Sequence, residues 1–305
     1  MAYSVTPGGA NYTGNFIPEV WSSKLIVNFY DATVLAAISN TDYEGEISGM
    51  GDKVNIRTTP QITIRPYVKG MQLQVERPDK PKIALNIDQG DYFNAVEDDV
   101  DRIQSDVNLM DAWSRDASEQ MKIVIDSKVL TGILPGISAL NQGAGAGRIS
   151  ANVNLGVTGA PLQLTKTNVI DAIVDSGQVL DEANVPETDR FLVIPAWVAA
   201  MIKKSDLKDT SLTGDAQTPL RNGRIGMIDR YTIYVSHNLN SVIDSGNRAF
   251  SILAGHKMGL TFASQMTNME SLRAESTFGT LIRGLQVYGY QVVKPEALAR
   301  LYVRA

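Results

Sequence analysis

The stretch from Asp91 to Thr131 contains neither glycine nor proline. Its apolar residues recur every three or four positions, as on one face of an α-helix: Val96, Val100, Ile103, Val107, Met110, Trp113, Ala117, Met121 and Val124. The spacing predicts a helix of about 35 residues, roughly 52 Å long. A compact chain of 305 residues would be about 50 Å across. Because such a helix spans the whole molecule, it favours an elongated or assembled protein over a compact enzyme.

The composition indicates a folded chain without thiol chemistry. Hydrophobic residues make up 44% and charged residues 20% of the sequence, which suits one large domain or two ordinary ones. There is no cysteine, so disulfides, thiolate nucleophiles and cysteine metal sites are excluded. Residues 1–15 lack the features of a secretory signal, and no run reaches the length of a membrane span. We therefore expect a protein made or assembled in the cytoplasm, with no membrane partner.

The charges change sign along the chain, although the formal net charge is only −5. In residues 1–48 the only cation is Lys24, and the acids are Glu19, Asp31, Asp42, Glu44 and Glu46. Residues 53–82 carry mostly cations: Lys53, Arg57, Arg65, Lys69, Arg77, Lys80 and Lys82. The expected helix is acidic again, with Glu97, Asp98 and Asp101 near its start. A protein that grips nucleic acid through its phosphates would show the opposite charge on its main surface.

Two segments precede the expected helix. Residues 18–39 have helical spacing, and Pro18 suits a first helical turn, so we expect an arm helix there. Residues 54–64 and 73–87 alternate apolar and polar side chains, and Pro66 and Gly70 between them suit a turn. This pattern predicts a β-hairpin. A ribbon with polar side chains on both faces is marginally stable alone, so it should lean on another part of the protein or on a neighbour.

The remaining chain reads as a mixed α/β domain. Glycines within residues 132–147 predict a flexible surface loop. Helices are expected at residues 164–180 and 197–203, and strands at 190–194, 231–235 and 250–253. From Glu270 onward the chain returns to extended structure.

No arrangement of residues predicts an enzyme, a metal site or a cofactor. The phosphate loop, the nucleophile elbow and the zinc-binding histidine pair are absent from the sequence. Ser205 and Lys208 match one short enzyme motif, but its partner motifs are missing. His237 and His256 fit turn or core positions better than ligands. The acids from Glu97 onward also fit a cation site, but stabilisation of a helix dipole is the simpler interpretation.

The predicted segments follow one another as an acidic arm, a basic hairpin, a long helix, a mixed α/β domain and a final extended segment. Several short stretches of sequence occur within them: Phe16-Ile-Pro-Glu-Val-Trp-Ser22, Ile87-Asp-Gln-Gly-Asp-Tyr-Phe93, Val96-Glu-Asp-Asp-Val100, residues 226–238, 254–257, 278–289 and 293–297. Together they resemble the major capsid protein of tailed bacteriophages, with the Hong Kong 97-type fold. The resemblance implies an α+β fold in five parts. These are an N-terminal arm (1–48), an extension loop (49–87), a peripheral domain with a spine helix (88–150), an axial domain (151–265) and a returning C-terminal segment (266–305).

The resemblance also implies partners and sites. Hexamers and pentamers of the chain would form an icosahedral virion shell that encloses double-stranded DNA without sequence-specific binding. A portal, a separate scaffolding protein and a decoration protein would be further partners. We expect contacts between subunits that join a basic loop (Lys53, Arg57, Arg65, Lys69 and Arg77) to an acidic arm (Glu19, Asp42, Glu44 and Glu46). The acidic side of the spine helix, with Glu97, Asp98 and Asp101, would face the DNA.

Two other classes remain open. An encapsulin-like nanocompartment shell shares the fold but encloses an enzyme, and only the contents of the particle would decide. A soluble hydrolase with a scattered site would instead be an active monomer. Some members of the capsid family also join subunits through a lysine–asparagine bond. Lys69 lies near the expected hairpin tip, but no partner asparagine can be aligned with it.

Overall fold

The computed structural model describes residues 33–42, 53–58, 60, 62–77, 82–99, 109–205, 227–274 and 278–305, without the side chains of 109–111 and 265–267. Its helices are α1 (Leu35–Ile38), α4 (Leu109–Gly132), α5 (Val169–Glu182) and α6 (Ala196–Lys204). Its strands are β1 (Lys53–Arg57), β2 (Lys82–Asn86), β3 (Gln89–Asp98), β4 (Leu162–Gln163), β5 (Arg190–Ile194), β6 (Met227–Ile228), β7 (Tyr231–Val235), β8 (Ser241–Asp244), β9 (Asn247–His256), β10 (Leu260–Arg273), β11 (Gly279–Val292) and β12 (Leu298–Arg304). The mixture of elements agrees with the α+β prediction.

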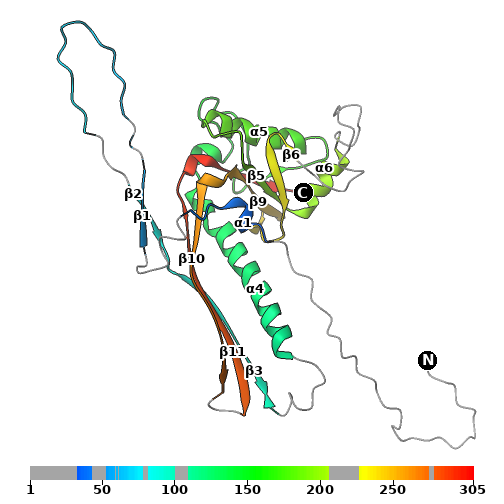
Figure 1. Ribbon diagram of the computed structural model, residues 1–305. Coiled ribbons are helices and arrows are strands. Elements are labelled where there is room, and N and C mark those ends of the chain that lie inside the picture. Colours follow the sequence, from blue (N-terminus) through cyan, green and yellow to red (C-terminus); the bar gives the residue numbers. More distant parts are fainter. Residues whose placement is uncertain are drawn as a thin grey trace, which may run out of the picture.

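A seven-stranded mixed sheet forms the rounded end of the molecule (Figure 1). Its strand order is β4-β12-β9-β5-β7-β6, with β8 paired to β9. All five residues of β5 are buried, because both faces of the sheet are covered. Leu192 and Ile194 pack with α5 and α6, whereas Phe191 and Val193 pack with α1 and the end of α4. This alternation explains why β5 reads in the sequence as a continuous apolar run.

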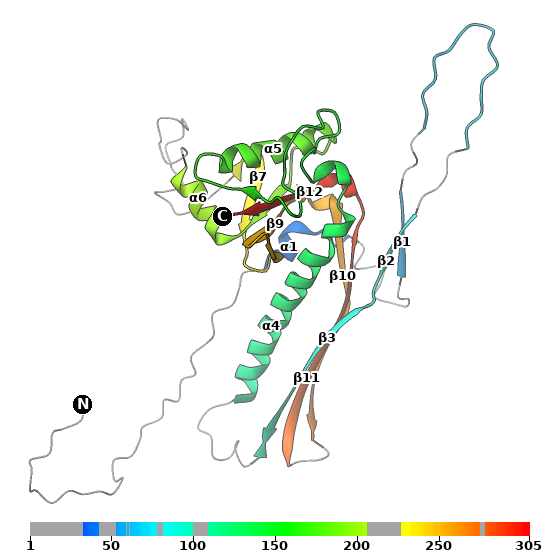
Figure 2. The same cartoon turned by 180° about the vertical axis from the view of Figure 1, so that it is seen from behind.

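A three-stranded antiparallel sheet, β10-β11-β3, extends away from this end, and α4 runs along one of its faces (Figures 1 and 2). Asp91 of β3 joins the two layers. It accepts a hydrogen bond from the buried Tyr288 hydroxyl of β11 at 2.9 Å, and it forms an ion pair with Lys128 of α4. Burial and the neighbouring Asp91 raise the pKa of Tyr288 far above its usual value, so its hydroxyl stays a donor.

The stretch that the sequence predicts as one long helix begins in the structure with a strand. Residues 89–98 form β3, which pairs with β11 from Gly279↔Asp98 to Tyr288↔Gln89. The described helix α4 has 24 residues, which is about 36 Å. The prediction was wrong for this stretch because its few apolar residues fit both periods. The 14-residue strand β11 supplies backbone hydrogen-bond partners there, and aromatic and β-branched side chains suit a strand.

The predicted β-hairpin is present at its base. Strands β1 and β2 pair antiparallel from Lys53↔Asn86 to Arg57↔Lys82, and Ile56 and Leu85 pack against Ala263 of β10. Beyond the base, residues 62–77 form an extended loop that projects from the body (Figure 1). The chain turns at Lys69 and Gly70, where Gly70 has a φ of +89°. Of the predicted arm helix, only α1 lies in the described part, and residues 18–32 lie outside it.

The helices α5 and α6 and the strands β5, β7 and β9 are present where the sequence predicts them, with shifted bounds, whereas β4, β6 and β8 were not predicted. Helix α5 begins at Val169 instead of Leu164, because Asn168 bonds to Thr165 before the first turn. The glycine-rich loop is held in place rather than open: the Glu182 carboxylate accepts hydrogen bonds from the backbone N–H groups of Ile149 (2.7 Å) and Ser150 (3.0 Å). In the described residues, no helix is both long and apolar enough to cross a membrane.

Candidate assembly surfaces

The sequence raises the question of a chemical role for His256, His237 and Ser205, and the structure shows the surroundings of each. His256 is buried, and its Nδ1 accepts a hydrogen bond from the Met258 N–H at 3.1 Å; burial lowers its pKa. His237 is exposed. The Ser205 hydroxyl donates to the Ile202 carbonyl at 2.6 Å, and Lys208 lies outside the described residues. In the described part of the chain, no group of three or more metal-binding side chains comes together.

Loop 62–77 exposes several large apolar side chains. Ile64 and Val75 are each 90% exposed and Leu73 is 75% exposed. The two limbs are joined by side chains, with Arg65 donating to Gln74 and Thr63 to Glu76 at 3.3 Å. Large apolar groups projected into water in this way mark a surface that binds another protein.

The predicted basic residues lie in this loop and on the strand at its base. Arg65, Lys69 and Arg77 are exposed in the loop, and Lys53 and Arg57 are exposed on β1 at its base. Asp42 is exposed and accepts a hydrogen bond from Asn40. Glu19, Glu44 and Glu46 lie outside the described residues. The structure therefore places the basic set on one projecting element, and the pairing with the acidic arm stays a prediction.

A second exposed surface is the face of the three-stranded sheet that α4 does not cover, here called the outer sheet face. Asp91 points to α4, so its neighbour Tyr92 points the other way, and Tyr92 is 78% exposed. Leu285 is paired with Tyr92 and shares its face, with Val96 and Leu272 farther along. The Arg283–Glu270 ion pair (2.6 Å) crosses the middle, beside a shallow cavity of about 430 Å³.

The predicted acidic helix needs a correction. Glu97 and Asp98 belong to strand β3, not to a helix, and Asp101 lies outside the described residues. Glu97 is buried, so its side chain adds little to any surface, whereas Asp98 is exposed. The neighbouring Asp99 forms an ion pair with Arg273 of β10. The helical assignment was wrong for the reason given above: β11 pairs with this stretch along its whole length.

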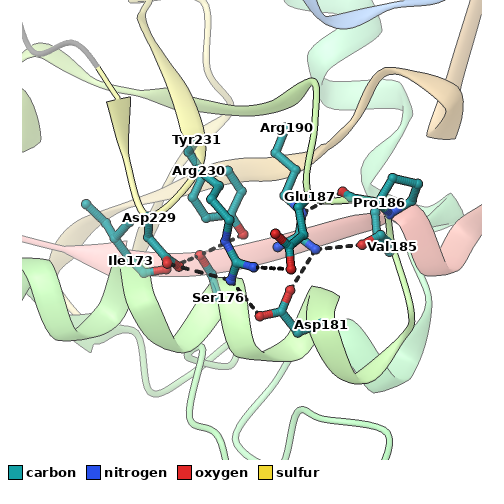
Figure 3. A network of polar contacts seen from close by, with 10 residues as sticks. All are labelled: Ile173, Ser176, Asp181, Val185, Pro186, Glu187, Arg190, Asp229, Arg230 and Tyr231. Atoms are coloured by element: carbon teal, nitrogen blue, oxygen red, sulfur yellow. Dashed lines mark hydrogen bonds and ion pairs between the residues drawn. The ribbon is translucent and has the colours of Figure 1, made fainter.

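A polar network that the sequence did not predict lies on the rounded end, centred on Arg190 (Figure 3). Arg190 begins β5 and is only 1% exposed. Its Nε donates to the Pro186 carbonyl at 2.8 Å and its Nη2 to the Val185 carbonyl at 2.6 Å. The same Nη2 lies 2.7 Å from the Asp181 carboxylate of α5. A charged residue at the start of an apolar strand is the one sequence signal that could have found it.

Arg230 extends this network to the turn between β6 and β7. It bonds to Asp181 at 2.7 Å and to Glu187 at 2.8 Å. Burial raises the pKa of Asp181, but the hydrogen bonds from Arg190 and Arg230 outweigh that effect and leave the pKa lowered. Beneath these charges, burial raises the pKa of Tyr231 to about 12. The network therefore joins the end of α5 to two strands of the sheet.

Comparison with known proteins gives this architecture its meaning. Residues 83–301 match the family of phage capsid proteins. The chain belongs to this family. A structure titled Mycobacterium phage Che8 is 28% identical, with a TM-score of 0.78 over 94% of this chain and 97% of that one. No curated protein sequence matches the chain.

More distant capsid structures share the fold. That of cyanophage P-SCSP1u is 14% identical, with a TM-score of 0.73 over 95% of this chain and 93% of that one. That of Myoviridae phage XM1 is 16% identical, with a TM-score of 0.64 over 97% and 99%. The capsid protein described here is thus a bacteriophage major capsid protein with the Hong Kong 97-type fold. It is a structural component of a virion shell, in which copies of it associate.

Proposed function

We propose that this capsid protein self-assembles as hexamers and pentamers into the icosahedral shell of a tailed phage, and that the shell encloses packaged double-stranded DNA. The observation that carries the proposal is loop 62–77. Its apolar side chains Ile64, Leu73 and Val75 are 75–90% exposed, and none of the described residues of the same chain covers them. Transfer of such side chains from water to a protein surface yields about 1.5–3 kcal/mol each, so contact with neighbouring subunits would be favourable.

In this proposal the loop lies across a neighbouring subunit. The basic side chains Lys53, Arg57, Arg65, Lys69 and Arg77 attract the neighbour's acidic arm, with Glu19, Asp42, Glu44 and Glu46. The exposed apolar side chains then bury themselves on the neighbour. Charges select and orient the partner, and apolar burial supplies most of the free energy of association.

The parts of the chain then take the roles expected from the sequence. Residues 1–48 form the arm, 49–87 the extension loop, 88–150 the peripheral domain, 151–265 the axial domain, and 266–305 the returning segment. The exposed Asp98, with Asp101, lines an acidic inner wall that encloses DNA without binding its sequence. A portal, a separate scaffolding protein and a decoration protein complete the particle, which assembles in the cytoplasm of the host bacterium.

Electron microscopy of the protein, produced with its scaffold, tests the proposal. The wild-type chain should give shells of tens of nanometres that contain DNA after packaging. Reversal of the charges of Lys53, Arg57, Arg65 and Lys69 to glutamate should prevent shells while circular dichroism shows a folded subunit. A matched control reverses the exposed Arg148 and Lys166, which lie outside the loop.

Normal shells from the loop variant would contradict the role of the basic residues. An active monomer in place of particles would contradict the capsid proposal as a whole. Shells that contain an enzyme and no DNA would identify the alternative, an encapsulin-like nanocompartment.

A further inference from the structure

Asp126 connects three segments that are far apart in the sequence. It lies on α4 and is 1% exposed. Its Oδ1 accepts hydrogen bonds from the backbone N–H groups of Val34 (3.1 Å) and Leu35 (2.9 Å), at the start of α1. Its Oδ2 accepts one from the Asn238 side chain (2.8 Å), in the loop after β7. The carboxylate therefore joins the segment around α1 to the spine helix and to the seven-stranded sheet.

Residues 33–42, here called the strap, contact the body at three further points. Ile38 is fully buried among core side chains of α4 and the sheets. The Asn40 N–H donates to the Leu260 carbonyl at 2.8 Å, and the Asn40 carbonyl accepts from the Phe262 N–H at 3.0 Å. A cavity of about 250 Å³ remains between the strap, α4 and Phe262. Because packing beside this cavity is incomplete, the polar bonds at Asp126 matter more for holding the strap.

Asp126 has no cation as a partner among the described residues. Lys122, one turn earlier on α4, lines the same cavity, but its amine pairs with Glu119 at 2.6 Å. Asp42 of the strap and His237 of the loop after β7 are exposed. Lys128 pairs with Asp91 of β3. The negative charge of Asp126 is thus held by three N–H donors alone.

We propose that Asp126 is a proton-linked latch that sets how firmly the strap binds to the spine helix. The inference does not depend on shell assembly, because every group involved belongs to one chain. When the strap leaves, Asp126 meets water and its carboxylate is stabilised by hydration. When the strap is bound, the carboxylate loses that hydration and gains only neutral donors, so protonation favours the bound strap.

The sign of the pH dependence follows from this cycle. In the bound state burial raises the pKa of Asp126 above its usual value, although the bonds from Asn238, Val34 and Leu35 oppose the rise. Binding of the strap therefore takes up a proton between the two pKa values. It is strongest at acidic pH and weakens as the pH rises through the raised pKa.

Thiol labelling can measure release of the strap, since the chain has no cysteine of its own. Ser39 is small and buried in the strap, so Ser39→Cys places a single thiol that reacts only when the strap opens. The reagent is a dipyridyl disulfide, which labels thiols at acidic as well as neutral pH. The full-length protein is labelled between about pH 3.5 and about pH 8, so that the range begins below the ordinary aspartate pKa of about 3.9. The Asp126→Asn variant, in the same Ser39→Cys background, mimics the protonated carboxyl. The measured quantity is the labelling rate with Asp126 unchanged, divided by the labelling rate of the Asp126→Asn variant at the same pH. This ratio cancels the pH dependence of the thiol's own reactivity.

We expect this ratio to rise with pH, by up to about tenfold for each unit by which the bound pKa exceeds the free one. Asp175→Asn is the matched control. Burial and the nearby Asp171 also raise the pKa of Asp175, but it lies on α5 and does not touch the strap. The labelling rate with Asp175 unchanged, divided by that of the Asp175→Asn variant, should not change with pH. Asp126→Ala should label rapidly at every pH, because the latch is gone.

A flat ratio for Asp126→Asn would overturn the proposal, as would an equal effect of Asp175→Asn. Should Asp126→Asn fail to fold, hydrogen exchange of the Val34 and Leu35 amides in the unchanged protein gives the same information. Their protection, corrected for intrinsic exchange, should fall as the pH rises. Protection that does not change with pH would equally contradict a proton-linked latch.

Discussion

The seven-stranded sheet and the three-stranded sheet differ in how the chain covers their apolar faces. In the first, the chain covers both faces itself, so that all five residues of β5 are buried. In the second, α4 covers one face, and the outer sheet face exposes Tyr92, Val96, Leu272 and Leu285. Loop 62–77 goes further and has no core of its own. One end of the capsid protein covers its own core, whereas the other presents apolar surfaces that the described residues leave exposed.

The largest effect on folding should come from a cavity in the self-covered sheet. Leu192→Ala removes a fully buried side chain of β5 and should lower the free energy of unfolding by about 2–5 kcal/mol. Denaturant unfolding of the subunit measures it. Val75→Ala in the loop is the control and should stay within about 0.5 kcal/mol of the wild type. Equal losses from the two variants would break the comparison.

A smaller loss is expected from the buried arginine. Arg190→Met keeps most of the side-chain volume but leaves the Val185 and Pro186 carbonyls without their donor. We expect the free energy of unfolding to fall by about 2–4 kcal/mol. Arg230→Met, which removes only the exposed arm of the network, should cost less. The ordering of these two variants in urea titrations would show whether the buried bonds or the surface ion pairs dominate.

Loop variants should separate folding from assembly. Ile64→Asp and Val75→Asp change side chains that are 90% exposed, so the free energy of unfolding should change by less than about 0.5 kcal/mol. Shell formation should nevertheless be lost, because each variant places a charge where a neighbour would bury an apolar group. Sedimentation of assembly mixtures measures this. Shells at wild-type yield would mean that the loop stays in solvent.

The smallest effect concerns Glu182 and the glycine-rich loop. Hydrogen bonds from the Ser150 backbone, from Gln178 and from the Ile149 backbone lower the pKa of Glu182 from 4.5 to about 2. The charged form is therefore favoured in the folded chain. Its contribution is complete above about pH 4.5 and is lost as the pH falls toward about 2. Amide exchange at Ile149 and Ser150 should follow that loss, and Glu182→Gln should remove the dependence.

Predictions from the sequence were most reliable where the apolar residues followed one clear pattern, either that of a strand or that of a helix. The apolar run of β5, the alternation of β7 and the amphipathic spacing of α5 all predicted elements that the structure contains. The hairpin and its turn at Gly70 followed from alternation and turn chemistry. The five basic side chains of the hairpin are exposed, because long charged side chains on a ribbon without a core remain in water.

Other features depended on partners distant in the sequence. Residues 89–98 carry a pattern that fits a helix as well as a strand, and the partner that decides between them, β11, comes almost 200 residues later. The role of Asp126 was hidden for a similar reason, since nothing near it in the sequence indicates that its side chain will be buried. For Arg190 the one signal was its place at the start of an apolar strand.

The sequence by itself determined an α+β chain without thiol chemistry, a long helix, a basic hairpin without a core, and a resemblance to capsid proteins. Periodicity, composition and turn residues are local properties, and they can be read without knowledge of the fold. Only the tertiary structure decided that residues 89–98 form a strand, which face of the long sheet α4 leaves uncovered, and that Asp126 binds the strap. These depend on long-range strand pairing and on desolvation, which arise only when distant segments meet.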